Sequence, residues 1–447
     1  MFSRVLVANR GEIAVRVIRS LHELGIEAVA VYSTADADAR HVRLADRAVC
    51  VGPPPAVESY LRIPSIVAAA TTTGCEAVHP GYGFLSENPA FVDACADNDL
   101  VFVGPPSHVM MNMGDKIAAR RAMRAADVPT VPGTDGATSI TAARAAADEI
   151  GYPVLLKAAA GGGGKGMRIV ESRDELEDAF GAAAAEAAAA FGDSTLYVEK
   201  VLVPARHVEI QVLCDGLGNV LTLGERECSV QRRHQKLIEE TPSPALSPEL
   251  REEMEAAAER ACRAVGYVNA GTFEFLLGPD GSFSFIELNA RLQVEHPVTE
   301  LTTGIDLVRS QLHVAAGEPL VLSGRAPRRG HSIEIRLNAE DPARDFMPAP
   351  GVVTKFRPPE GPGVRVDTFL EDGTEVTPYY DSLLAKLVVW DEDRPSAIAR
   401  ALRALDETVI DGVPSTRELA SAVIRSDEFS SGEYSTSTLA ELMEPVG

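Results

Sequence analysis

The chain has 447 residues, of which 45% are hydrophobic and 24% are charged, and its formal net charge is −23 at pH 7. This composition excludes a disordered or fibrous chain, and the excess of acidic residues disfavours nucleic acid and anionic membranes as partners. The length is too great for a single hydrophobic core, so we expect two to four domains.

The N-terminal residues alternate between strand and helix patterns. Residues 4–8 and 27–32 are apolar runs typical of buried strands, and residues 13–24 between them have helical periodicity. A strand–helix–strand unit of this kind indicates a parallel sheet. Another strand is expected at 100–103, so we place a first α/β domain at residues 1–112.

A second domain is predicted over residues 113–333, and it contains a compact insert at 132–203. The insert is expected to comprise a helix over 142–150, strands over 154–157 and 167–170, an alanine-rich helix around 182–187 and a strand over 195–199.

A glycine-rich segment at residues 161–166 lies between two strands of this insert. Glycine lets the backbone approach a phosphate group closely and point its N–H groups at it. The segment is not a Walker A loop, because position 159 is Ala and Gly166 follows the lysine. We therefore expect a mobile lid over phosphate rather than a flexible linker.

Four antiparallel strands are expected next, over residues 207–214, 220–227, 272–277 and 284–288. Glu274 and Glu287 lie on the last two strands, which we expect to pair as a hairpin, and Asn289 shares a face with Glu287. Two carboxylates and an amide oxygen are ligands that suit Mg²⁺, and acids in buried strands need partners. This pattern predicts a metal site. His79, His207 and His234 are too widely spaced in the sequence to indicate a second metal site.

Arg291, Gln293 and Glu295 continue the same alternation beyond the hairpin. Together with Lys236 and Arg336 they could form a cationic site for a small anion, with Glu295 as a base. Each of these residues, taken singly, would be explained by a surface ion pair. The hypothesis therefore depends on how many of them lie close together in the sequence.

Lysine is scarce in this chain. Of 42 basic residues only seven are lysines, namely Lys116, Lys157, Lys165, Lys200, Lys236, Lys355 and Lys386. Because arginine is used wherever any cation will serve, we expect the remaining lysines to lie where a compact ammonium group is needed.

The segment from His331 onward has many short strands and is expected to end in a helix over 394–405, so we assign a third, mixed domain to residues 334–447. The six cysteines are scattered, which suits a reducing cytoplasm. We see no signal peptide and no apolar run long enough for a membrane span, and we expect a cytoplasmic protein without membrane association.

Several stretches together closely resemble the biotin carboxylase subunits of bacterial acetyl-CoA carboxylases and related acyl-CoA carboxylases, which are ATP-grasp enzymes. The matching stretches are residues 9–14, 79–88, 113–116, 161–166, 231–236, 287–300 and 379–382. The resemblance covers essentially the whole chain. It implies an N-terminal parallel α/β domain, an ATP-grasp domain with a glycine-rich lid and a C-terminal mixed domain.

The resemblance also implies a role for individual residues. It assigns ATP binding to Lys116, Lys157, Gly163, Gly164, Glu199, Lys200, Val201, Leu202, His207 and His234. It assigns Mg²⁺ or Mn²⁺ to Glu274, Glu287 and Asn289. It assigns bicarbonate to Lys236, Arg291 and the backbone of Val294. Glu295 would deprotonate bicarbonate for attack on the γ-phosphate of ATP, and Arg336 would face biotin and stabilise its enolate.

By the same resemblance, bicarbonate is activated as carboxyphosphate and its carboxyl group is transferred to biotin. This is the first half-reaction of an acyl-CoA carboxylase, which typically makes malonyl-CoA from acetyl-CoA for fatty acid synthesis. The chain has no Ala-Met-Lys-Met motif for biotin attachment. The biotin carboxyl carrier protein and the carboxyltransferase are therefore expected on separate chains, and a homodimer is expected.

Two other interpretations share some of these features. A different ATP-grasp ligase, such as a carbamoyl phosphate synthase or an aminoimidazole ribonucleotide carboxylating enzyme, would share the lid and the metal acids but would not be expected to carry the motifs at 234–236 and 291–296. A non-catalytic nucleotide-binding protein would be expected to lack metal acids or phosphate lysines, and this chain has all the candidates.

Overall fold

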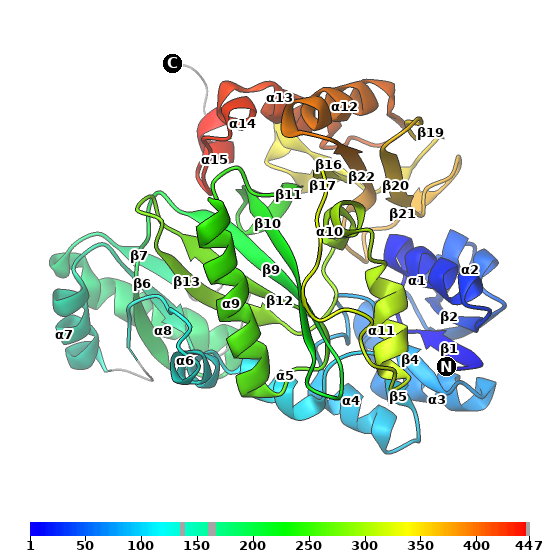
Figure 1. Cartoon of the computed structure of the whole chain (residues 1–447), viewed down its shortest axis with the longest axis horizontal. Helices are drawn as coiled ribbons and strands as arrows, with labels where there is room; N and C mark the ends of the chain where they lie inside the picture. Colours follow the sequence, from blue (N-terminus) through cyan, green and yellow to red (C-terminus); the bar gives the residue numbers. More distant parts are fainter. Residues whose placement is uncertain (135–138, 160–166, 444–447) are drawn as a thin grey trace.

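The computed structural model describes residues 1–134, 139–159 and 167–443 (Figure 1). An N-terminal α/β unit and a small sheet that forms one end of the molecule both join a long, mostly antiparallel sheet. The C-terminal helices lie above that sheet in Figure 1. The arrangement confirms the mixed α/β and α+β class.

The N-terminal unit is a parallel sheet with the strand order β3-β2-β1-β4-β5. Its strands are β1 (Arg4–Val7), β2 (Glu27–Ser33), β3 (Arg47–Gly52), β4 (Ala77–His79) and β5 (Val101–Phe102). Its helices are α1 (Gly11–Glu23), α2 (Arg40–Leu44), α3 (Ile63–Thr73), α4 (Pro89–Ala96) and α5 (Ser107–Gly114). Val5, Leu6 and Val7 are fully buried, because helices cover both faces of a parallel sheet and leave no strand face for polar residues.

The predicted insert forms a separate small antiparallel sheet with the strand order β7-β6-β8. Helix α6 (Lys116–Ala125) precedes this insert, whose elements are α7 (Ile140–Ile150), β6 (Val154–Ala158), β7 (Met167–Val170), α8 (Leu176–Phe191) and β8 (Leu196–Lys200). Ala143, Leu156 and Val198 pack in its own apolar core, which is distinct from the core of the long sheet. The predicted glycine lid at 161–166 lies outside the described residues.

The long sheet has the strand order β13-β12-β9-β10-β11-β15-β22-β20, and β14 pairs with β10 at the side. Its strands are β9 (Arg206–Cys214), β10 (Val220–Arg232), β11 (Gln235–Thr241), β12 (Asn269–Leu277), β13 (Phe283–Asn289), β14 (Gly324–Arg325), β15 (His331–Asn338), β20 (Val364–Thr368) and β22 (Leu383–Asp391). The helices that follow β11 and β13 are α9 (Pro248–Val265), α10 (His296–Thr303) and α11 (Leu307–Ala315).

The two faces of this sheet differ in chemistry. On β9, Val208, Ile210 and Val212 belong to the apolar core that also includes residues of α9. Because side chains alternate along a strand, His207 and Glu209 point to the opposite face, where α10 packs. On β9 and β12, His207, Glu209 and Glu274 therefore lie on the face opposite α9, whereas Glu225 on β10 pairs with Arg251 of α9.

One expectation about the C-terminal region needs correction. The chain does not end its regular structure at α12 (Arg394–Glu407), since α13 (Arg417–Arg425), α14 (Asp427–Ser431) and α15 (Thr438–Met443) follow. Helices of five to nine residues are too short to give a clear periodic signal. The predicted boundary between residues 333 and 334 lies within β15, through which the long sheet runs.

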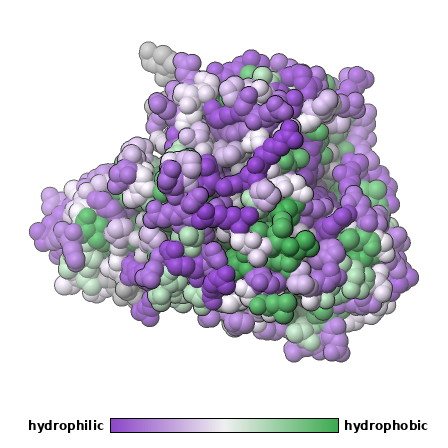
Figure 2. All heavy atoms as spheres, in the orientation of Figure 1, coloured by the Kyte–Doolittle hydropathy of each residue, from purple (hydrophilic) through white to green (hydrophobic). Residues whose placement is uncertain are grey.

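Short strand pairs complete this region, namely β16 (Glu340–Asp341) with β17 (Met347–Pro348), β18 (Gly351–Val352) with β21 (Glu375–Val376), and β19 (Lys355–Arg357) with β23 (Val409–Asp411). The face in Figure 2 is mostly hydrophilic, with apolar residues gathered near α11. No helix in the described ranges is both long and apolar enough to cross a membrane.

Glu240 on β11 joins the C-terminal helices to the sheet. Its buried carboxylate accepts hydrogen bonds from Arg394 at 2.8 and 3.0 Å, from His331 at 2.6 Å and from the hydroxyl of Tyr434 at 2.5 Å. Burial alone would raise the pKa of Glu240, but the bonds from His331 and Arg394 outweigh it and lower the pKa to about 2.

We expect Glu240→Gln to lower the melting temperature at pH 7 and to do so less as the medium is acidified. The ionised carboxylate stabilises the fold above its unfolded pKa of about 4.3, and this contribution, on the order of 3 kcal/mol, is lost as pH falls toward about 2. Thermal melts between pH 7 and pH 3 measure the effect, with exposed Glu392→Gln as the control. A constant difference across this range would contradict the assignment.

Candidate active site

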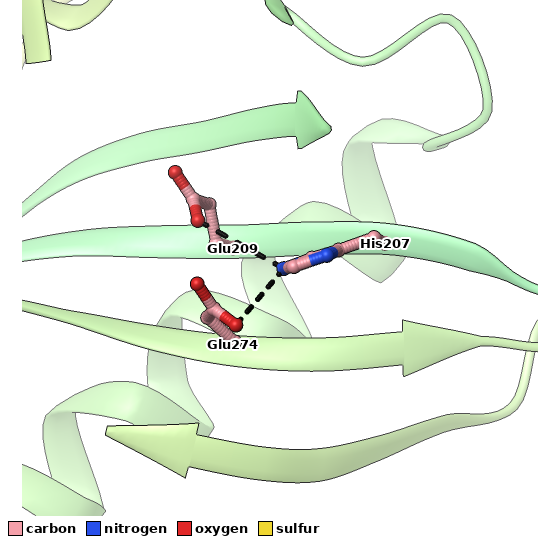
Figure 3. A group of neighbouring side chains, drawn as sticks. All are labelled: His207, Glu209 and Glu274. Atoms are coloured by element: carbon pink, nitrogen blue, oxygen red, sulfur yellow. Dashed lines mark ion pairs between the residues drawn. The ribbon is translucent and has the colours of Figure 1, made fainter. Parts of the chain in front are cut away.

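Carboxylates from neighbouring strands form a row on the polar face of the long sheet. Glu209 on β9 lies opposite Glu274 on β12, and Glu274 lies opposite Glu287 on β13. Figure 3 shows His207 on the same strand as Glu209, with its ring directed toward Glu209 and Glu274. Glu209 and Glu274 are buried, and buried acids require cations within reach.

Lys236 on β11 supplies one of these cations. Its ammonium lies 2.7 Å from Glu209, 3.0 Å from Glu274 and 2.5 Å from Glu295. Burial would lower the pKa of Lys236, but the surrounding carboxylates raise it well above its ordinary value. All three N–H donors of the ammonium are thus engaged, and an anion that binds here must take one of them from a carboxylate.

By residue type and proximity alone, a metal ion could be held by three neighbouring side chains, those of His207, Glu209 and Glu274 (Figure 3). The Nε2 atom of His207 lies 3.2 Å from Glu274 and 4.0 Å from Glu209. Lys236 already provides the positive charge between these two carboxylates. A divalent cation at the same point would be repelled by the ammonium, so this group is complete without a metal.

Arg226 on β10 lies beneath this row and is fully buried. All five of its N–H donors are satisfied, by Glu209 at 2.5 Å, Gln293 at 2.8 Å and the side chains of Gln211, Thr272 and Thr299. Gln293 in turn donates to Glu274 at 2.9 Å. Sequence reasoning missed Arg226, because it stands between Glu225 and Glu227 and a charged run of that kind is typical of a solvated segment.

Arg336 on β15 meets the same cluster from the C-terminal side. Its guanidinium donates to Glu239 at 2.7 Å and to Glu295 at 3.0 Å. Burial would raise the pKa of Glu295, but Lys236 and Arg336 hold it well below the ordinary value. The structure thus brings together Lys236, Glu295 and Arg336, which are separated by up to 100 positions in the sequence.

The expected alternation through residues 291–295 is wrong. Strand β13 ends at Asn289, and residues 290–295 form a loop that leads into α10. Glu87 holds this loop by accepting from the backbone of Ala290 at 2.9 Å and from Arg291 at 2.7 Å. Side chains of the loop still reach the site because the loop folds over the sheet, and not because they share a strand face.

Glu287 differs from the other acids of the site. It has no hydrogen-bond or ion-pair partner among the described residues, and it faces the carboxylate of Glu274 across the hairpin. Desolvation and the charge of Glu274 raise the pKa of Glu287. Asn289 accepts from Arg291 at 2.8 Å and keeps a second lone pair. The carboxylate of Glu287, which has no such partner, and the amide oxygen of Asn289 beside it fit the donor set of a hard divalent cation.

The predicted nucleotide residues lie at the junction of the small sheet and the long sheet. Lys157 pairs with Glu199 at 2.6 Å, and Arg120 also pairs with Glu199. Because this carboxylate is engaged by two cations, an adenine contact here would come from the backbone of residues 199–202. The ammonium of Lys200 is turned away and donates to the carbonyl of Gly151 at 2.8 Å.

Lys116 and His234 complete this group. Burial and the nearby charge of Lys157 lower the pKa of both Lys116 and His234. Cationic side chains near one another suit phosphate groups. Predicted ATP-binding residues Gly163 and Gly164 lie outside the described residues.

Comparisons with known proteins agree with this geometry. Residues 1–110 match the model of the biotin carboxylase N-terminal domain, residues 115–323 that of the carbamoyl-phosphate synthase L chain ATP-binding domain, and residues 334–441 that of the biotin carboxylase C-terminal domain. The chain belongs to the biotin carboxylase family. It is an ATP-grasp ligase that carboxylates biotin at the expense of ATP, the first half-reaction of acyl-CoA carboxylases.

Individual relatives cover nearly the whole chain. It is 51% identical to a biotin carboxylase of Nostoc sp. over 443 residues, 99% of both chains. It is also 52% identical to a pyruvate carboxylase subunit from Methanothermobacter thermautotrophicus over 438 residues, 98% of this chain and 89% of that one.

Solved biotin carboxylases have the same fold. A biotin carboxylase–β,γ-ATP complex from Campylobacter jejuni has a TM-score of 0.96 at 47% identity, with 99% of both chains covered. The dimeric biotin carboxylase domain of the Hydrogenobacter thermophilus 2-oxoglutarate carboxylase, in complex with MgADP, ADP and bicarbonate, has a TM-score of 0.94 at 47% identity and covers 99% of this chain and 98% of that one.

Glu287→Gln should lower Mg²⁺-dependent ATP cleavage by about a hundredfold or more, since it preserves shape and removes the charge that a divalent cation needs. Steady-state rates over a Mg²⁺ titration measure the effect. Exposed Glu375→Gln on β21 serves as the matched control. Wild-type activity of Glu287→Gln at equal Mg²⁺ would remove the hairpin from the metal site.

Proposed function

We propose that this chain activates bicarbonate with MgATP as carboxyphosphate and transfers the carboxyl group to biotin on a separate carrier protein. The observation that carries the proposal is the position of Glu295 between Lys236 and Arg336. This reaction needs a base that lies between two cations, one that binds bicarbonate and one that faces biotin.

Bicarbonate would bind to Lys236, Arg291 and the backbone N–H of Val294. An incoming anion competes with Glu295 for an N–H donor of Lys236. Losing that donor makes Glu295 more basic than it is in the free protein, and Glu295 can then accept the bicarbonate proton. The resulting oxyanion attacks the γ-phosphate of ATP, which gives carboxyphosphate and ADP.

The nucleotide would lie between the small sheet and the long sheet. Lys116 and Lys157 would bind its phosphates, and the backbone of residues 199–202 with His207 and His234 would hold the adenine end. Glu274, Glu287 and Asn289 fit Mg²⁺ or Mn²⁺, which neutralises phosphate charge when bound. Residues 132–203 would close over ATP as a lid.

Biotin would enter a cavity of about 360 Å³ beside Glu295. The cavity is lined by residues that include Arg336, Tyr82, Gly83 and Val294. A guanidinium keeps its charge at working pH, so Arg336 can stabilise the enolate that forms when N1′ of biotin loses its proton without donating a proton itself.

The carrier protein and the carboxyltransferase would be separate chains, and the protein would act as a homodimer. The Methanothermobacter relative, named as a subunit, is covered over 89% of its length, which supports the separate-chain arrangement. The Hydrogenobacter thermophilus biotin carboxylase domain is a dimer, which supports the homodimer.

Lys236→Ala should lower the rate of bicarbonate-dependent ATP cleavage about a hundredfold or more, and it should leave nucleotide binding largely intact. The physical reason is that the ammonium faces the proposed bicarbonate and the phosphate lysines lie elsewhere. Turnover and fluorescent-nucleotide titration measure the two effects. Lys355→Ala, far from the cluster, is the control, and unchanged turnover in Lys236→Ala would exclude this lysine from the bicarbonate site.

Arg336→Gln should lower biotin carboxylation about a hundredfold, while the slow bicarbonate-dependent ATP cleavage without biotin falls less. Both rates are measured beside the melting temperature, with exposed Arg329→Gln as the control. If Arg336 serves only its ion pairs with Glu239 and Glu295, both rates and the melting temperature fall together, and the assigned role is refuted.

A further inference from the structure

Lys386 on β22 is one of the scarce lysines, and the proposed reaction leaves it without a role. It is fully buried, and its ammonium donates to the carbonyl of Val294 at 3.0 Å and lies 3.1 Å from Glu12. The strand register places it directly beside Arg336 on β15 and Asp367 on β20. Burying a cation away from water is costly. A buried ammonium that points at a backbone carbonyl therefore indicates that this carbonyl is held in a fixed position.

The carbonyl in question belongs to the loop that carries Glu295. At one end of the loop, the Nδ1 atom of His296 lies 2.8 Å from the carbonyl of Gln293, and it must carry the proton because a carbonyl only accepts. Lys386 holds the next carbonyl along. Since a peptide group is planar, fixing two successive carbonyls fixes the N–H groups of Val294 and Glu295 as well.

We propose that Lys386 is a positioning residue for the bicarbonate site: by holding the Val294–Glu295 peptide group it sets the backbone that carries the carboxylate of Glu295, while the bond from His296 to the carbonyl of Gln293 sets the N–H of Val294. The inference rests on the proposed binding of bicarbonate at Lys236, Arg291 and Val294. Lys386 itself touches neither bicarbonate nor ATP in this scheme.

The competing explanation is that Lys386 only balances buried charge. Asp367 already has Arg365 at 2.7 and 3.0 Å, and it lies 3.8 Å from Lys386. Glu12 is the acid that lies nearest to the ammonium of Lys386, and it also accepts from the hydroxyl of Tyr82. Burial raises the pKa of the neighbouring Glu334 well above its ordinary value, although the charge of Lys386 acts to lower it. Removing both charges together restores the balance but does not restore the hydrogen bond to Val294, so the two roles can be separated.

The experiment compares Lys386→Met, Glu12→Gln and the double variant Lys386→Met/Glu12→Gln with the wild type, and uses Lys355→Met as a matched control. Each protein is assayed for melting temperature and for the KM of ATP and of bicarbonate in ATP cleavage without biotin. Lys386→Met should melt lower, because it strands the charge of Glu12. The double variant should recover most of the melting temperature.

The decisive result is the bicarbonate KM. We expect it to rise about tenfold or more in the double variant, where a charge-assisted hydrogen bond is lost, with the KM of ATP unchanged. Glu12→Gln and Lys355→Met should keep the wild-type bicarbonate KM. A wild-type value in the double variant would reduce Lys386 to charge balance, and a melting temperature as low as that of Lys386→Met would assign it to the fold. Failure of the proposed function is distinct, since the wild type itself would then cleave ATP without needing bicarbonate.

Discussion

Neutralisation of buried charge on one face of the long sheet is the constraint on which the site depends. Glu209, Glu274 and Glu295 are all withdrawn from water, and the ammonium of Lys236 lies 2.5 to 3.0 Å from each of them. Arg226 then fixes Glu209 from below, and Gln293 links the same arginine to Glu274. The resulting ring of bonds leaves little freedom for any member to move alone.

The alternation of side chains along the strands makes this arrangement possible. One face of β9 and β12 contributes to the apolar core with α9, which offsets the entropic cost of ordering the strands, and the other face carries the charges. Because β15 and β22 extend the same sheet, Arg336 and Lys386 approach the cluster on rigid strands rather than on loops. Rigid support keeps a catalytic geometry within narrow limits.

Sequence reasoning predicted the long, periodic elements and the pairing of Glu274 with Glu287, because alternation on two strands joined by a short turn is a local signal. It could not predict that Arg226 would join Gln293 and Glu209, since such contacts depend on tertiary packing. The extension of β13 through residue 295 was wrong for a related reason. Polar alternation alone does not show where a strand leaves its sheet, and here Glu87, far away in the sequence, holds the chain as a loop.

The continuity of the long sheet across residues 331–338 also limits how far the C-terminal segment is a separate module. Strand β11 pairs with β15 on one side and with β10 on the other. A fragment that stopped before β15 would leave β11 as an open edge, with unpaired backbone groups able to join another chain. Recombination between relatives at this point would therefore cut a sheet instead of a linker, and the segments on both sides must be inherited together to keep that edge covered.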